Sequence, residues 1–102
     1  MRLFLPLLLL LSACTTGSTV VTGKVSEPVD LADVRVLYQR PSCEFEEVAR
    51  IDIPGNYFDR VRLIDAMREQ AAALGADQLQ IVDLQLVGSS EYRGSARALR
   101  CR

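Results

Sequence analysis

Residues 56–75 carry the clearest periodicity in this chain, and it is helical. Apolar side chains recur there every three or four residues and form one stripe: Tyr57, Val61, Ile64, Met67, Ala71 and Leu74. Asn56 is the expected N-cap, Asp59 falls in the first turn, and Gly75 suits the left-handed position that ends a helix. We therefore expect one helix whose stripe packs against a sheet, an arrangement that gives a cofactor site little support.

Three strand candidates precede the helix. Residues 20–25 are rich in β-branched side chains, which favour strands. Residues 34–39 and 44–53 alternate between apolar and polar side chains, although Val48 interrupts the second alternation. Pro54-Gly55 is expected to end the last of these strands.

Two more strands, residues 78–87 and 93–101, are expected after the helix. In the first, Leu79 and Ile81 share one face but the apolar residues from Val82 onward share the other, which indicates a bulge or a central position buried on both sides. The second strand has a face of small residues that lets a helix approach closely: Gly94, Ala96 and Ala98. The predicted fold class is α+β, with a single helix packed on a mostly antiparallel sheet of four or five strands in a two-layer sandwich.

The first thirteen residues have the features of an export signal. Arg2 is followed by a short apolar run and then by small residues. The run is too short for a transmembrane helix, which needs about 20 apolar residues, and Pro6 interrupts it. The stretch Leu11-Ser12-Ala13-Cys14 resembles a bacterial lipobox. That resemblance implies cleavage before Cys14 and attachment of a lipid to its sulfur.

The expected domain organisation follows from this cleavage. Residues 1–13 are the lipoprotein signal peptide, residues 14–19 are the lipidated N-terminus and a tether that lets the domain stand off the membrane, and residues 20–102 are a periplasmic domain. Removal of residues 1–13 leaves 89 of the 102 residues, enough for one domain. Thr15 stands where an Asp would imply retention in the inner membrane, so the resemblance implies the outer membrane of a Gram-negative bacterium, facing the periplasm.

The composition argues against several classes of function. The 12 basic residues are balanced by 13 acidic ones, which gives no support for nucleic-acid binding. The chain has no His, the commonest general base and metal ligand, so we expect no metal, no cofactor and no enzymatic activity. Acid–base work by Glu44, Glu46 and Glu47 is the enzyme alternative, although charges on a strand face usually serve solvation.

Two cysteines remain once Cys14 is lipidated. The periplasm is oxidising, and small exported domains often depend on disulfides, so we expect Cys43 to pair with Cys101. The closed loop of nearly sixty residues implies about 4 kcal/mol of stabilisation by the chain-entropy model. The functional alternative is a redox-active or metal-responsive pair, but catalytic pairs usually lie close in sequence.

Four arginines lie near the C-terminus: Arg93, Arg97, Arg100 and Arg102. They can attract anionic headgroups or lipopolysaccharide phosphates. The simpler interpretation is that they protect or solvate an edge strand.

The segment Arg68 to Asp77 resembles a signature of small proteobacterial outer-membrane lipoproteins of unknown function, "Leu-Arg-x-x-Ala-Ala-x-Leu-Gly-Ala-Asn". The end of the chain, Gly94 to Cys101, and the region around Cys43 are also similar to that group. The group includes the sensor lipoprotein of the Rcs envelope-stress phosphorelay, and similar domains occur in proteins described as heavy-metal-binding. The Rcs sensor differs in having four domain cysteines and a long proline-rich tether.

The sequence thus predicts a lipid-anchored envelope protein that acts by binding, as a sensor or a scaffold. We expect the protein to be attached to the membrane through the lipid on Cys14. We also expect an envelope protein partner, which the sequence does not identify. The alternative is an Rcs-like stress sensor, or a thiol- or metal-responsive protein that uses Cys43 and Cys101.

Overall fold

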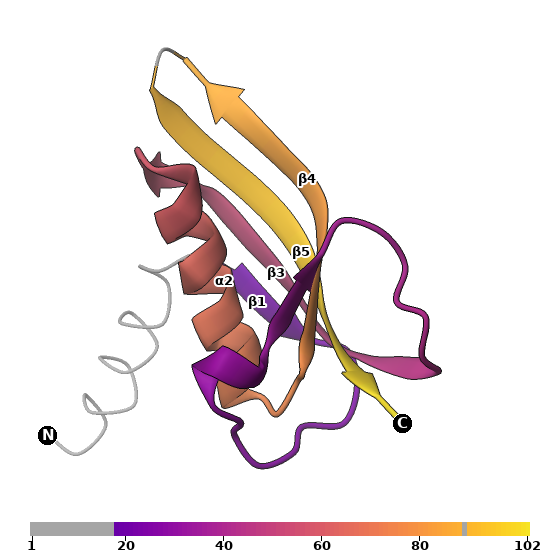
Figure 1. Ribbon diagram of the computed structural model, residues 1–102. Coiled ribbons are helices and arrows are strands. Elements are labelled where there is room, and N and C mark those ends of the chain that lie inside the picture. Colours follow the sequence, from indigo (N-terminus) through magenta and orange to yellow (C-terminus); the bar gives the residue numbers. More distant parts are fainter. Residues whose placement is uncertain (1–17, 89) are drawn as a thin grey trace, which may run out of the picture.

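The computed structural model describes residues 18–88 and 90–102 (Figure 1). The export signal and Cys14 lie outside the described residues. The elements follow the chain in this order: β1 (Ser18–Val21), the 3-10 turn η1 (Leu31–Asp33), β2 (Arg35–Leu37), β3 (Phe45–Tyr57), α2 (Arg60–Ala73), β4 (Gln78–Val87) and β5 (Glu91–Cys101).

The five strands form one sheet in the order β1-β3-β5-β4-β2, and α2 covers one face of it (Figure 1). Among the strands of the described residues, only β2 and β4 pair in parallel. The predicted fold, one helix on a mostly antiparallel sheet, is therefore confirmed. The prediction that residues 78–87 occupy the centre is wrong, because β5 is central and β4 pairs with β2 only from Gln78 to Gln80.

The core lies between α2 and the sheet face that it covers, here called the helix face. Small side chains on β5 let α2 approach, as predicted: Ala96 and Ala98 are buried, and a Cβ built on Gly94 would lie 3.2–3.3 Å from Leu84, Leu63 and Met67. The other large buried side chains of the helix face come from β3 and β4: Val48, Ile51, Ile53, Leu79 and Ile81.

Two β-bulges explain the breaks in the predicted alternation. The register between β3 and β5 shifts between Glu47 and Ala49, so that Val48 and Ala49 are both buried. The register between β4 and β5 shifts between Ile81 and Asp83, and Val82 is 60% exposed. The bulge explanation for residues 78–87 is therefore confirmed, and Leu84 opposite Gly94 stays on the helix face.

The start of the helix differs from the prediction. Asp59, not Asn56, is the N-cap, and its carboxylate accepts a hydrogen bond of 2.9 Å from the Val61 N–H. Strand β3 runs through Pro54-Gly55 to Tyr57, because Gly55 and Asn56 adopt positive φ and a second irregularity in the β3–β5 register accommodates them.

The buried stripe is also rotated from the predicted one. It is set by the i, i+4 series Leu63, Met67 and Ala71, whereas Val61 is 63% exposed. Tyr57, Ile64 and Leu74 only partly enter the core.

The end of the helix matches the prediction. Gly75 has φ +83°, and the N–H groups of Gly75 and Ala76 donate to the carbonyls of Ala72 (3.1 Å) and Ala71 (3.0 Å). This pair of hydrogen bonds is a Schellman motif, in which the residue after the C-cap adopts a left-handed conformation that suits glycine.

The first strand begins earlier than expected. β1 covers Ser18–Val21, instead of starting at residue 20, and pairs antiparallel with β3 so that Ser18 lies opposite Asp52. The domain therefore begins within residues predicted to be tether, and only residues 15–17 separate Cys14 from the sheet.

Candidate functional site

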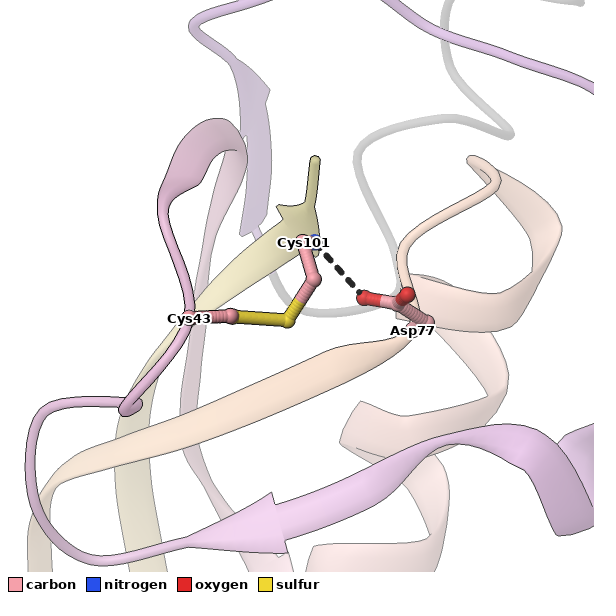
Figure 2. Close-up of a disulfide and its surroundings, with 3 residues drawn as sticks. All are labelled: Cys43, Asp77 and Cys101. Carbon is pink, nitrogen blue, oxygen red and sulfur yellow. Dashed lines mark hydrogen bonds between the residues drawn. A yellow bond between two sulfur atoms is a disulfide. The ribbon is translucent and has the colours of Figure 1, made fainter.

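Cys43 and Cys101 form a disulfide, as predicted (Figure 2). Their Cα atoms are 5.7 Å apart and 58 residues separate them in sequence. The bond joins the β2–β3 connection to the last residue of the central strand. The Cys101 N–H donates to Asp77 Oδ1 (3.1 Å), so the disulfide is also tied to the start of β4.

The β2–β3 connection, residues 38–44, lies on the side of the sheet away from α2, here called the open face (Figure 1). The Phe45 ring belongs to this face, and the guanidinium carbons of Arg40 and Arg97 lie 5.6 and 5.8 Å from its centroid. Leu99 is fully buried although its register places it on the open face, outside the helix-side core. The disulfide therefore holds a small second cluster beneath this connection.

Beyond that cluster the open face is a set of paired polar side chains. Arg97 lies 3.5 Å from Glu47 and donates to Gln80 (3.1 Å). Arg93 donates twice to Gln85, at 2.9 and 2.6 Å. Two further pairs complete the set: Arg50 with Glu47 and Ser95 with Asp52. Arg50 and Glu47 lie three residues apart on β3, and the other pairs join neighbouring strands.

Arg100 lies on the other side of the sheet and joins three distant segments. Its guanidinium contacts Glu46 (3.2 Å) on β3, the Gly75 carbonyl (3.3 Å) after α2 and the Lys24 carbonyl (2.7 Å) after β1. A guanidinium suits this position because its fixed fork of donors reaches several acceptors at once. Arg102 adds a 3.5 Å contact to Glu46.

The C-terminal arginines therefore have protein partners in this structure. The edge-strand interpretation is wrong, because β5 is the central strand of the sheet. Arg93, Arg97 and Arg100 each contact side chains or carbonyls of neighbouring segments, which accounts for them as structural residues.

The three glutamates considered for acid–base work do not converge. Glu46 and Glu47 point to opposite faces of β3, and each is held by arginines: Arg100 and Arg102 for Glu46, Arg50 and Arg97 for Glu47. Glu44 is exposed, and its carbonyl accepts a hydrogen bond from the Arg102 N–H (2.8 Å). Nothing in this arrangement pairs one carboxylate with another.

The surface has several hollows, and the widest described one, of about 800 Å³, lies beside Arg100 and residues 24–29. Another, of about 210 Å³, lies on the open face between Asp52, Asp83 and Arg93. Within residues 18–88 and 90–102, no polar or charged side chain is buried and no three potential metal ligands gather. In the same part of the chain, no helix is long and apolar enough to cross a membrane.

Sequence reasoning missed the turn end, defined here as residues 57–62: the last residue of β3, the two connecting residues 58–59 and the first three residues of α2. Five consecutive residues, 58–62, are exposed. Phe58 is 72% exposed, and Val61 beside it is also exposed. The signal was in the sequence, where Phe58 precedes the run Arg60-Val61-Arg62, but the predicted stripe assigned Val61 to the core.

Comparisons with known proteins inform the fold. No family model matches the chain, and no curated protein matches it. Among solved structures, the crystal structure of the Francisella virulence factor FvfA in the orthorhombic form is similar, with a TM-score of 0.58 and 14% sequence identity. The match covers 80% of this chain and 94% of that one. At this identity the likeness shows a shared fold alone.

Proposed function

We propose that this protein is a lipoprotein of the outer membrane that faces the periplasm and acts by binding, as a sensor or scaffold. The observation that carries the proposal is the sequence Leu11-Ser12-Ala13-Cys14 at the end of a short apolar run. Cys14 receives the lipid and becomes the first residue of the mature chain.

The folded domain supports export to an oxidising compartment. It holds the remaining two cysteines in a disulfide that joins the β2–β3 connection to β5. Sheet structure begins only four residues after Cys14, so cleavage at that position leaves the domain whole.

The described surface supports binding in preference to catalysis. Most charged side chains of the open face have partners on the sheet, and Glu46 and Glu47 lie on opposite faces of it. A non-enzymatic module needs only an exposed surface, and the turn end provides one that the fold does not use.

Metabolic labelling tests the proposal. The full chain, expressed in a Gram-negative host with labelled palmitate, should incorporate label and fractionate with the outer membrane. Cys14→Ala should abolish both while leaving a folded, disulfide-bonded domain. Thr15→Asp should move the protein to the inner membrane, and Thr15→Ala is the matched control that should not. Membrane localisation and labelling of Cys14→Ala would refute the proposal.

A partner is sought by crosslinking in intact cells followed by affinity purification of the outer-membrane form. The binding role predicts that one envelope component is recovered repeatedly with the wild-type chain and is lost with Cys14→Ala. Repeated recovery of no protein, glycan or lipid would contradict the binding role without affecting the lipid assignment.

A further inference from the structure

The short distance between the lipid site and the sheet fixes how far the domain can stand from the membrane. Four residue steps separate Cys14 from Ser18, and at most about 3.6 Å per step they span no more than about 14 Å. This argument rests on the proposed lipidation of Cys14. It replaces the expected stand-off tether with a domain held close to the bilayer.

The position of β1 selects the end of the domain that lies within reach. Ser18 pairs with Asp52 and β1 runs antiparallel to β3, so the chain enters from the direction of the turn end. Thr19 next to it contacts Gln70 of α2. Ten residues of helix separate Gln70 from Arg60, about 15 Å at 1.5 Å per residue. The maximum distance from Ser18 to the lipidated residue is therefore close to the distance from Gln70 to the turn end.

The disulfide lies in the opposite direction. Phe45, which pairs with Cys101, is seven residues from Asp52 along β3, about 23 Å at the rise of a strand. Figure 1 shows the β3–α2 connection and the C-terminus at opposite ends of the sheet. A lipid on Cys14 therefore holds the turn end near the bilayer and leaves the disulfide end away from it.

The side chains at the turn end suit a headgroup layer. Phe58 and Val61 are exposed apolar groups, and Arg60 and Arg62 beside them are exposed cations. Aromatic rings and arginines favour the membrane interface, where the apolar part is buried and the charge meets phosphate. Asp59, the acidic residue between Phe58 and Arg60, caps the helix by accepting a hydrogen bond from the Val61 N–H.

Arg60 and Arg62 have fewer protein partners than the arginines near the C-terminus. Arg60 has a 3.5 Å contact with the hydroxyl of Tyr38, itself an exposed aromatic residue. Across the described ranges, the Arg62 side chain makes no hydrogen bond or ion pair, whereas Arg100 is held by three segments. Arg62 is thus available to a phosphate.

We propose that the turn end lies against the lipid headgroups, with Phe58 inserted among them and Arg60 and Arg62 at their phosphates. The lipid on Cys14 supplies the affinity, and the turn end sets the orientation. The open face and the disulfide end then project into the periplasm.

Depth-dependent quenching tests the orientation. The lipidated full chain, with a single added cysteine carrying a fluorophore, is placed in vesicles of phosphatidylethanolamine and phosphatidylglycerol containing a brominated lipid. The labelled positions are Val61→Cys at the turn end, Glu69→Cys midway along α2 and Glu27→Cys near the far end of α2. All three residues are exposed, and Ser26 beside Glu27 bonds the carbonyl of Leu74.

We expect quenching at position 61 to exceed that at 27 and 69 by about threefold or more, because of these three positions only 61 lies at the end of the domain that reaches the headgroups. Adding Phe58→Ser to the Val61→Cys chain should reduce quenching by about half, whereas adding Glu69→Ser should not. Equal quenching at 61 and 69 would mean a flat-lying domain, and no quenching at any position would mean stand-off; either result overturns the proposal. Mass analysis of the N-terminal peptide distinguishes failure of the orientation from failure of the proposed function. If Cys14 carries the lipid and quenching is equal, only the orientation is refuted. If Cys14 carries no lipid, the proposed function is refuted as well.

Discussion

The two ends of this small domain are built differently. At the disulfide end, a covalent bond, two arginines within 5.8 Å of the Phe45 ring centre and the contacts of Arg100 hold five segments together. At the turn end, Phe58 and Val61 are exposed and the arginines have few protein partners. The first end is fixed by its own contacts, whereas the second leaves apolar and cationic groups facing outward. We interpret the first as the source of stability and the second as the surface left for contact.

Removing the disulfide should have the largest effect on stability. In a Cys14→Ser background, Cys43→Ser combined with Cys101→Ser should lower the free energy of unfolding by about 4 kcal/mol, because the unfolded chain regains the entropy of a long loop. Denaturant titration measures the difference. Ser42→Ala, next to the disulfide and exposed, is the control and should change it by less than about 0.5 kcal/mol.

The same experiment examines the thiol-responsive alternative. A structural bond should resist mild reductant, and its loss should destabilise the whole fold. Ready reduction with little loss of stability would contradict the interpretation that the disulfide end is the source of stability. It would favour a redox role for Cys43 and Cys101.

The sequence predicted the layers of this fold better than its details. Alternation and helical period identified the strands and the single helix, and the small face of β5 correctly predicted close approach by α2. The bulges at Val48 and Val82 appeared only as breaks in alternation, because a bulge is decided by pairing with another strand. The helix start was misplaced because Gly55 and Asn56 let β3 continue past the proline.

The candidate site was also predicted only in part. The cysteine pair was predictable because the proposed lipidation of Cys14 leaves only Cys43 and Cys101. The partners of Arg100 were not, since two of them are backbone carbonyls from segments 25 and 76 residues away in sequence. The exposure of Val61 depends on the phase of α2, which the packing of Leu63 and Met67 sets.

An identical substitution at each end sharpens the comparison. Arg100→Met should lower stability by about 1–3 kcal/mol, because Glu46 and two carbonyls lose a charged donor. Arg62→Met should change stability by less than about 0.5 kcal/mol, because this exposed side chain has no such partners among the described residues. Thermal and denaturant unfolding of the two variants give the values. Similar losses for both would show that the turn end is also held by its own contacts.

The smallest effect on stability is expected at Phe58. Phe58→Ser removes an aromatic ring that is 72% exposed, so folding gains little from its burial and the free energy of unfolding should change by about 0.5 kcal/mol or less. Phe45→Ser is the matched control at the other end, where the half-buried ring lies within 5.8 Å of the Arg40 and Arg97 guanidinium carbons, and it should cost several times more. Denaturant titration of both lipid-free variants measures this difference. A loss at Phe58 as large as that at Phe45 would mean that the ring serves the fold, and the turn end would then no longer be a surface left for contact.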